Sequence, residues 1–438
     1  MILVDAALRE RAARGEDVVV ALSGAGFAAQ GLVMQLHDAA PGIRIGVITN
    51  RTLQTVVDLL ATVGIDDYVV VDDPQQLDTV IERGQIAVTT DYELACGSGR
   101  VEVVVEATGE IEHGARVSLA AIAARKHLVL VNAELDATLG PILKVKADEA
   151  GVVFTDTDGD QPGALMNLKR EAEFRGFQPL LLGNIKSLLD HRRTPETQAA
   201  FAANVRQRPK MITSFADGTK IAAEMATLAN GSGFGVGTRG MYGPEVDHVD
   251  NAHKAYDLDM LLESGGLVDY IIGAEPSFGV FVLAYSEHDL RNFYMKVYKM
   301  GDGPLYTFYI PYHLSSLETP GTIGRAACFG DAALTPVGAP VCDVIAMAKF
   351  DLVSGQELDA VGGFTVYGLM ENSPAARAEN LIPLGLTDGA ILRRDAAMDG
   401  VLTFDDVDLP DDRVSLDLWH EQCALFPLGR PVAQTSVG

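Results

Sequence analysis

The chain has 438 residues, of which 48% are hydrophobic, and a formal net charge of −26 at pH 7. This length predicts two or three domains, and the acidic balance argues against nucleic acid or an anionic membrane as a partner. No uncharged apolar run is long enough to span a bilayer. Charged residues soon follow the N-terminus, which excludes a signal peptide, and the four scattered cysteines predict no disulfide or zinc cluster. We therefore expect a cytoplasmic protein.

Residues 1–160 show short apolar strands that alternate with helical patterns such as Thr52–Val63 and His113–Arg125. This alternation is typical of an α/β fold, here a Rossmann domain with a doubly wound parallel sheet. The predicted strands are Asp17–Ser23, Ile43–Thr49, Tyr68–Val71, Val101–Glu106, Leu128–Val131 and Val152–Thr155.

A glycine-rich turn follows the first predicted strand and has the spacing Gly-x-Gly-x-x-Ala. Gly24 permits a tight turn, and Gly26 lets the backbone approach a pyrophosphate. The helix that begins near Phe27 and Ala28 directs its N-terminus at the anion. A glycine-rich turn without a ligand is the alternative, but the position between strand and helix favours a dinucleotide site.

The end of the second strand indicates which dinucleotide binds. An NAD site usually carries Asp or Glu there, to hold the ribose 2′-hydroxyl. This chain has Asn50 and Arg51, which suit a 2′-phosphate, so we expect NADPH. An ordinary solvated arginine is the alternative reading of Arg51. Small residues at Ala107, Thr108 and Gly109 predict the nicotinamide end of the site, with Asn132 after the next strand.

Residues 161–335 mix a helical stretch, Gly218–Leu228, with the β-rich runs Tyr270–Tyr285 and Tyr294–Tyr298. This pattern predicts an α+β domain for the substrate and for dimerisation. Residues 336–438 are rich in turns and short strands, such as Val344–Lys349, and predict a small β-rich module. The last residues, Gly429–Gly438, read as a flexible tail.

Within the second domain, the run from Ser214 to Glu224 holds the densest group of charged residues. Asp217, Lys220 and Glu224 are spaced three and four residues apart, so we expect them on one face of a helix that Asp217 caps. Such a face could bind a metal, move a proton or hold a polar substrate. A surface stripe of ion pairs is the alternative.

Other polar residues stand where strands end. Asp160 lies in the loop Asp158–Gly163. Lys186 follows the candidate strand Leu180–Ile185 and could polarise a carbonyl or bind an anion. His313 could act as an acid or base, and Arg325 could bind an anion. A local turn, a solvated lysine and a buried hydrogen-bonded histidine are the alternatives. The sequence has no Gly-x-Ser-x-Gly, P-loop or His-Glu-x-x-His motif.

Several longer motifs extend along most of the chain. They are Asn132–Asp136, Gly140–Lys144, Asp158–Gly163, Gly183–Lys186, Thr213–Lys220, Gly303–Tyr306 and Pro311–Leu314. With them the chain resembles the deoxyxylulose-phosphate-reductoisomerase-like (DXR-like) oxidoreductases, which join a homoserine-dehydrogenase-like Rossmann half to a C-terminal SAF-type module. It departs from true homoserine dehydrogenases at Glu134, where those enzymes carry lysine.

The resemblance implies an NADPH-dependent reductase or reductoisomerase of a small polyhydroxylated ketose or polyol, phosphorylated or not, as in conversion of deoxyxylulose phosphate to methylerythritol phosphate. It also implies a homodimer and a divalent metal, Mg or Mn, for which Asp217 and Glu224 are the expected ligands. Hydride would pass to a carbonyl held between the first and second domains. The expected catalytic residues are Lys220, Asp217, Lys186, Glu224, Asp160 and Glu134, and the expected substrate-binding residues are Asn184, His313 and Arg325.

Two other functions remain open at this point. One is a plain polyol, hydroxy-acid or homoserine-type dehydrogenase that leaves the carbon skeleton intact. The other, of a different class, is a sensor that binds NADPH and a sugar without turnover. Fold and cofactor site do not fix the substrate.

Overall fold

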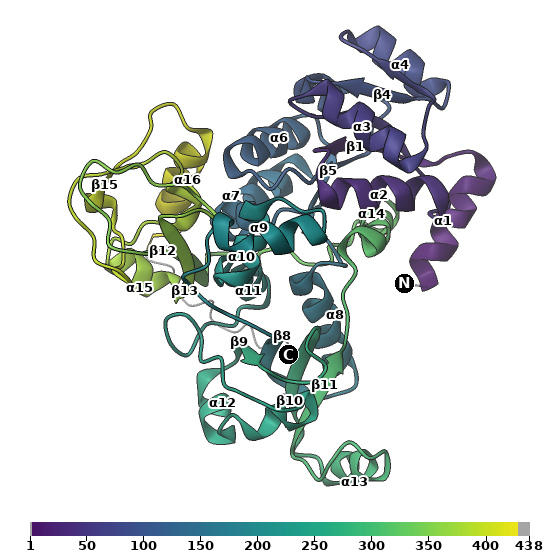
Figure 1. Cartoon of the computed structure of the whole chain (residues 1–438). Helices are drawn as coiled ribbons and strands as arrows, with labels where there is room; N and C mark the ends of the chain where they lie inside the picture. The colour runs from purple at the N-terminus through teal and green to yellow at the C-terminus, as the bar shows by residue number, and fades with distance from the viewer. Residues whose placement is uncertain (1, 428–438) are drawn as a thin grey trace. The chain divides into compact units, whose positions relative to one another are not determined.

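The computed structural model describes residues 2–427, so the expected flexible tail, Gly429–Gly438, lies outside the described residues. The chain has an α/β fold, as predicted, and forms two compact units. Of the described residues, the first unit comprises 2–163 and 314–335, and the second comprises 164–313 and 336–427. Figure 1 labels their helices and strands.

The first unit is a Rossmann domain built on a seven-stranded sheet of order β3-β4-β2-β1-β5-β6-β7. All neighbouring strands in it are parallel. Its strands are β1 (Val18–Ser23), β2 (Ile43–Thr49), β3 (Tyr68–Val70), β4 (Ile86–Thr89), β5 (Val103–Glu106), β6 (His127–Leu130) and β7 (Phe154–Asp156). The sequence analysis missed β4, which has only four residues.

Helices connect these strands, as the parallel pairing requires. The connecting helices are α2 (Phe27–Asp38), α3 (Leu53–Val63), α4 (Pro74–Glu82), α5 (Tyr92–Gly97), α6 (Ile111–Ala123) and α7 (Ala133–Ala150), and α1 (Ile2–Arg14) precedes β1. Local sequence sets several ends: Asp73 caps α4 and precedes Pro74, whereas Gly64 ends α3 in the left-handed conformation.

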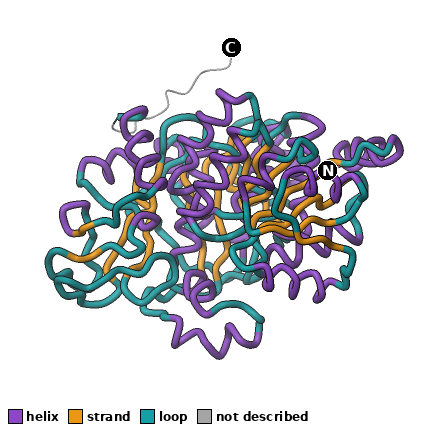
Figure 2. The backbone as a smooth tube through the Cα atoms, turned by 90° about the horizontal axis from the view of Figure 1, so that it is seen from above, coloured by secondary structure: helices purple, strands orange, loops and turns teal. Residues whose placement is uncertain are grey.

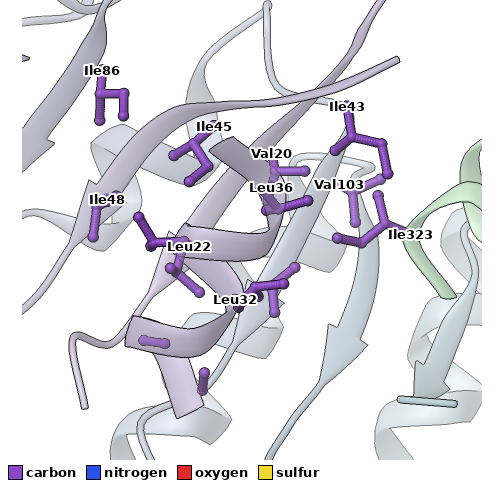
Figure 3. Close-up of a cluster of buried hydrophobic side chains, with 14 of the residues drawn as sticks. Val20, Leu22, Leu32, Leu36, Ile43, Ile45, Ile48, Ile86, Val103 and Ile323 are labelled. Atoms are coloured by element: carbon purple, nitrogen blue, oxygen red, sulfur yellow. The ribbon is translucent and has the colours of Figure 1, made fainter. Parts of the chain in front are cut away.

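A later helix, α14 (Ser315–Phe329), returns to the first unit. Its Ile323 is fully buried and belongs to the Rossmann core cluster that also contains Val20, Leu32 and Val103 (Figure 3). The Ser316 hydroxyl also donates to the carbonyl of Ala28 at 3.0 Å. Residues 314–335 were predicted within the second domain, and these contacts explain why the structure groups them with the first.

The second unit contains a mixed sheet of order β11-β10-β8-β9. Its strands are β8 (Gln178–Lys186), β9 (Leu267–Ile272), β10 (Val280–Tyr285) and β11 (Leu305–Ile310). Figure 2 shows strands in orange and the helices around them in purple. The helices and the 3-10 turn of this part are α8 (Gln161–Phe174), α9 (Pro195–Asn204), α10 (Pro209–Ala216), α11 (Thr219–Ser232), η1 (Val249–Lys254), α12 (Leu258–Ser264) and α13 (Asp289–Val297).

The prediction of a β-rich run at Tyr294–Tyr298 is wrong, because residues 289–297 form α13. Leu290, Phe293, Tyr294 and Val297 recur at helical spacing, although their aromatic and β-branched character favours strands. All four side chains are exposed. The run Tyr270–Tyr285 is two strands, β9 and β10, with a loop between them.

The C-terminal part of the second unit is rich in short strands, as predicted. It holds two two-stranded antiparallel sheets, β12 (Cys342–Ala348) with β13 (Val366–Asn372), and β14 (Ile391–Leu392) with β15 (Val407–Asp408). The helical elements around them are α15 (Ser373–Ala378), η2 (Leu384–Leu386), η3 (Phe404–Asp406) and α16 (Val414–Leu425). We call residues 336–427 the C-terminal module.

Helix α11 joins the two parts of the second unit. Residues 219–231 are all buried, because the helix contacts β9 of the mixed sheet as well as β12 and β13 of the C-terminal module (Figure 1). The helix ends at Ser232, four residues beyond the predicted stretch Gly218–Leu228, and Gly233 terminates it in the left-handed conformation. Among residues 2–427, no helix has the length and apolarity that crossing a bilayer requires.

Candidate functional site

The glycine-rich turn of the first unit has the conformation that a dinucleotide site needs. Gly24 has φ +113°, and a Cβ on it would lie 2.8 Å from the carbonyl oxygen of Ala107 at the end of β5. Only glycine fits such a close approach. Gly26 caps α2 without a side-chain hydrogen bond, and a Cβ there would meet nothing within 4 Å. Open space therefore lies before the N-terminus of α2, which suits a phosphate group.

The residues expected to set cofactor choice lie at the end of β2. The Asn50 side chain donates to the carbonyl of Thr52 at 3.0 Å, and Arg51 is exposed. Burial lowers the pKa of His113 on α6, and the positive charge of Arg51 lowers it further. Arg51 and His113 are therefore near enough to interact electrostatically. Phe27 is exposed and Ala28 is half-buried at the start of α2.

A buried hydrogen-bond network joins the ends of β5 and β6. Glu106, which is fully buried, accepts from the backbone N–H of Thr108 at 2.9 Å and from the Thr108 hydroxyl. Its other oxygen accepts from the Asn132 amide at 2.8 Å. The sequence analysis assigned Thr108 and Asn132 to the cofactor but gave Glu106 no role. A glutamate that directly follows three valines in a strand was the signal.

Helix α7 carries two further buried carboxylates in its first turn. Glu134, an expected catalytic residue, is 4% exposed, and Asp136 is completely buried. Burial raises the pKa of Asp136 to about 7. Within residues 2–427, neither oxygen of Asp136 has a hydrogen-bond partner, and sequence reasoning gave this residue no function.

The loop Asp158–Gly163 is tightly packed in the first unit. A Cβ on Gly163 would lie 2.0 Å from the carbonyl oxygen of Thr157, so glycine is needed for this close approach. The Asp160 carboxylate accepts from the backbone N–H of Gln161 at 3.0 Å, and Asp160 is 8% exposed. Asp160 therefore supports the start of α8.

Arg325 was expected to bind an anionic substrate, but its guanidinium holds the loop to α14. Nη1 donates to Asp158 at 2.6 Å, Nε donates to Asp331 at 2.8 Å, and Nη2 donates to the carbonyl of Ala332 at 2.9 Å. These contacts use all three nitrogens and leave the side chain 12% exposed. The structure gives Arg325 a structural role in the first unit.

The second unit brings together three of the predicted catalytic residues. The Nζ of Lys220 lies 3.8 Å from the Glu224 carboxylate one turn later on α11, and both side chains are at most 10% exposed. Lys186 comes from the end of β8. Burial lowers the pKa of the Lys186 ammonium, the charge of Lys220 lowers it further, and Glu224 opposes this effect. We call Lys186, Lys220 and Glu224 the lysine cluster.

The prediction that Asp217 shares a helical face with Lys220 and Glu224 is wrong. Asp217 precedes α11, whose N-cap is Gly218. One carboxylate oxygen accepts from the backbone N–H of Thr219 at 2.9 Å, and the other accepts from the ammonium of Lys349 at 2.8 Å. Asp217 and Lys349 are both completely buried. Lys349 was missed, although a lysine after a fully apolar stretch is unusual.

The other expected substrate residues lie on the mixed sheet or after it. Asn184 is buried within β8, opposite Val280 of β10. His313 is half-buried, and its ring lies 4.4 Å from the ring of Phe278. The expected metal ligands do not meet, because Asp217 faces Lys349 and Glu224 faces Lys220. Residues 2–427 contain no group of three His, Cys, Asp or Glu side chains arranged for a metal ion.

Similar solved structures include a probable dehydrogenase from Thermotoga maritima (TM-score 0.40, 10% identity, 73% of this chain and 91% of that chain). DOX-P reductoisomerase with fosmidomycin and magnesium is another (TM-score 0.38, 14% identity, 72% of this chain and 70% of that chain). A third is the WlbA dehydrogenase from Bordetella pertussis in complex with NADH and UDP-GlcNAcA (TM-score 0.30, 14% identity, 42% of this chain and 50% of that chain). At such low scores these likenesses carry no argument about the chain. No curated protein matches it.

Residues 159–319 match the sequence model of a family described as oxidoreductase DRL, catalytic domain. The matched segment contains Asp160, Asn184, His313 and the whole lysine cluster, whereas Arg325 lies beyond it. The Rossmann unit that precedes this segment has a glycine turn and a helix N-terminus suited to a dinucleotide. The chain thus combines a segment similar to an oxidoreductase catalytic domain with a Rossmann unit whose turn is suited to a dinucleotide.

Proposed function

We propose that the chain is an NADPH-dependent reductase of a small polyhydroxylated ketose, with deoxyxylulose phosphate as the first substrate to test. The observation that carries this proposal is the lysine cluster, which lies within the segment that matches an oxidoreductase catalytic domain. The buried ammonium of Lys220 and the half-buried lysine Lys186, together with one carboxylate, are suited to a carbonyl oxygen that gains negative charge.

The lysine cluster can supply the proton that reduction of a carbonyl requires. The bound nicotinamide supplies a hydride to the carbonyl carbon. Lys220 hydrogen-bonds the carbonyl oxygen, and Lys186 donates the proton that converts this oxygen to a hydroxyl. The lowered pKa of Lys186 makes its ammonium a better proton donor than an ordinary lysine. Glu224 holds Lys220 in place, and a proton from solvent water returns the Lys186 amine to its ammonium form.

The first unit supports NADPH as the cofactor. The open space before α2 fits a pyrophosphate, and no carboxylate follows β2 to repel a 2′-phosphate. Asn50 and Arg51 stand in that place, with His113 within electrostatic reach of Arg51. A guanidinium binds phosphate through charge-assisted hydrogen bonds.

The charge of the lysine cluster favours an anionic or electron-rich substrate. Two ammonium groups and one carboxylate leave a local positive charge in a chain whose net charge is −26. A phosphorylated ketose fits this local charge better than homoserine, which carries its own ammonium. Asp217 and Glu224 do not fit a divalent metal, so no step is assigned to one.

We also propose that the protein is a homodimer formed through the mixed sheet. β11 is an edge strand of that sheet, and an edge strand offers unpaired backbone groups to a second copy. Size-exclusion chromatography with light scattering would measure the molar mass of the protein in solution. A monomer at micromolar concentration would contradict this proposal.

The function is tested by following NADPH oxidation with deoxyxylulose phosphate and with a panel of non-phosphorylated ketoses, with and without Mg²⁺. We expect sustained oxidation that is lost in Lys220→Ala. Lys254→Ala serves as the control, because Lys254 is exposed and its ammonium donates to the Asn251 side chain at 2.8 Å, outside the lysine cluster. Tight NADPH binding without oxidation of the cofactor by any ketose would contradict the proposal and favour a sensor.

The product decides between two kinds of reductase. Mass and NMR analysis of a reductoisomerase product would show methylerythritol phosphate, with a rearranged carbon skeleton. A product that keeps the connectivity of the substrate would identify a plain polyol dehydrogenase instead.

A further inference from the structure

A buried lysine of the C-terminal module, Lys349, contacts Asp217 near the start of α11. Lys349 follows β12 and is completely buried. Its ammonium donates to the Asp217 carboxylate at 2.8 Å, to the carbonyl of Arg193 at 2.8 Å and to the carbonyl of Gly363 at 2.7 Å. All three ammonium donors are therefore satisfied, as a buried lysine requires.

Asp217 passes this contact to the first turn of α11. Its second oxygen accepts from the backbone N–H of Thr219, which is the first residue of the helix. The Thr219 hydroxyl in turn accepts from the backbone N–H of Gly368 in β13 at 3.0 Å. Two strands of the C-terminal module thus fix the residue directly before Lys220.

The surrounding loop strengthens the same junction. The His191 ring contacts the carbonyl oxygen of Asp217 at 2.6 Å and stacks on Tyr367 of β13 at 4.3 Å. Arg192 donates to the carbonyl of Lys349 at 2.5 Å. The loop, the start of α11 and the C-terminal module therefore form one connected network around the buried ion pair.

We propose that Lys349 is a positioning residue, which acts through Asp217 to hold Lys220 in place for its hydrogen bond to the carbonyl oxygen of the substrate. This inference rests on the proposed function, and it gives the C-terminal module a part in the reaction. Lys349 cannot touch the substrate itself, because it is completely buried and its donors are all used. Removing either charge leaves the other uncompensated in the protein interior.

The test compares Lys349→Met, Asp217→Asn and the double variant in the full chain, at a temperature at which each is folded. We expect kcat to fall by about ten- to hundredfold in each single variant, because small displacements of a catalytic group have effects of this size. The Kd for NADPH should stay unchanged. The double variant, whose pair is neutral, should recover part of the kcat that Lys349→Met loses.

Asp343→Asn is the matched control. Asp343 is 4% exposed and pairs with Arg377 at 3.3 Å in the same module, but at the opposite end of β12. It should lower the stability without lowering kcat. A folded Lys349→Met protein with the wild-type kcat, or an equal loss of kcat in Asp343→Asn, would overturn the proposal. A double variant as inactive as Asp217→Asn would assign the chemistry to Asp217 instead.

Hydrogen exchange separates this inference from the proposed function. If the wild-type protein oxidises no NADPH with any ketose, the proposed function fails, but exchange still reports on α11. Lys349→Met should then lose protection in the peptide that spans residues 218–224 and keep it at the C-terminal end of α11. Unchanged protection in residues 218–224 would refute the positioning role by itself.

Discussion

Asn132 donates its side-chain amide to the carboxylate of Glu106 at 2.8 Å, so that the end of β6 is tied to the end of β5. The Asn132 oxygen also accepts from the backbone N–H of Leu135 at 3.2 Å and caps α7. Burial raises the pKa of Glu106 to about 7, although the hydrogen bonds from Thr108 and Asn132 lower it. One amide therefore serves both a buried acid and a helix N-terminus.

We expect Asn132→Ala to destabilise the protein by about 2–4 kcal/mol, because a cap contributes about 1 kcal/mol and a buried acceptor left unsatisfied costs about 1–3 kcal/mol. Urea unfolding measures the change. Asp73→Ala is the control, since Asp73 caps α4 and has no buried acid as partner, and it should cost only about 1 kcal/mol. Equal losses would show that Glu106 does not depend on Asn132.

Two neighbouring glycines should respond differently to alanine. Gly24→Ala should lower stability by about 1–3 kcal/mol, because it places a Cβ 2.8 Å from the Ala107 carbonyl at φ +113°. Gly26→Ala should cost less, about 0.5–1 kcal/mol, because its Cβ would meet nothing within 4 Å and alanine is only a poorer N-cap than glycine. That Cβ would occupy the space before α2, so NADPH affinity should fall by about tenfold, or about 1.4 kcal/mol.

Thermal unfolding and NADPH fluorescence titration distinguish the two effects. Gly24→Ala mainly tests the contribution of the turn to stability, and Gly26→Ala mainly tests its contribution to NADPH affinity. If Gly26→Ala binds NADPH as tightly as the wild-type protein, the pyrophosphate does not lie at the N-terminus of α2.

The first unit could be predicted because its signals are local. Buried β-branched runs such as Val18–Ser23 and a glycine turn before a helix follow from chain order alone. The mixed sheet could be predicted only in part, since α13 has the residue types of a strand with the spacing of a helix. The apolar side chains of α13 are exposed, and their residue types led to the wrong prediction of a strand.

The lysine cluster could be predicted where spacing along one helix was enough, as for Lys220 and Glu224. Lys186 was predicted separately, from the end of a strand. Asp217 was assigned the wrong neighbours because its partner, Lys349, lies 132 residues away in sequence. Arg325 was read as an anion site, yet its main partners are carboxylates brought near by the return of α14. Such long-range pairings follow from tertiary structure and leave no local pattern.

The lysine cluster predicts a characteristic pH dependence of reduction. Lys186 must be protonated to donate, and burial together with Lys220 lowers its pKa against the opposing effect of Glu224. The rate should therefore fall as pH rises, at a pH below the usual range of lysine. Lys186→Arg should move this fall to higher pH, because arginine stays protonated. A pH profile of kcat that is the same in both proteins would exclude Lys186 as the proton donor.

Arg51 should determine the preference for NADPH over NADH. A charge-assisted hydrogen bond to a phosphate contributes about 1.5–3 kcal/mol, so Arg51→Ala should weaken NADPH binding by roughly 10- to 100-fold. Affinity for NADH, which has no 2′-phosphate, should stay the same. Titrations with both cofactors measure the ratio, and Arg83→Ala at the exposed end of α4 is the control. Equal weakening of both cofactors would place Arg51 elsewhere on the nucleotide.

Asp136 should make the protein less stable as pH rises. Its pKa is about 7 in the folded chain and near 3.8 when exposed, so the folded state binds more protons between these values. The stability that protonation supports is complete below the lower pKa and is lost as pH rises through about 7. Asp136→Asn removes this titration while it keeps the shape of the side chain.

The variant should therefore gain stability relative to the wild-type protein between about pH 5 and about pH 8. Urea unfolding midpoints at the two pH values measure this difference. Glu106 titrates in both proteins, so its contribution to stability cancels in the comparison. Asp148→Asn is the control, because Asp148 on the same helix is exposed and pairs with Lys144. A stability difference between Asp136→Asn and wild type that does not change with pH would mean that Asp136 is already ionised in the folded chain. A partner cation would then have to lie beside it in solution.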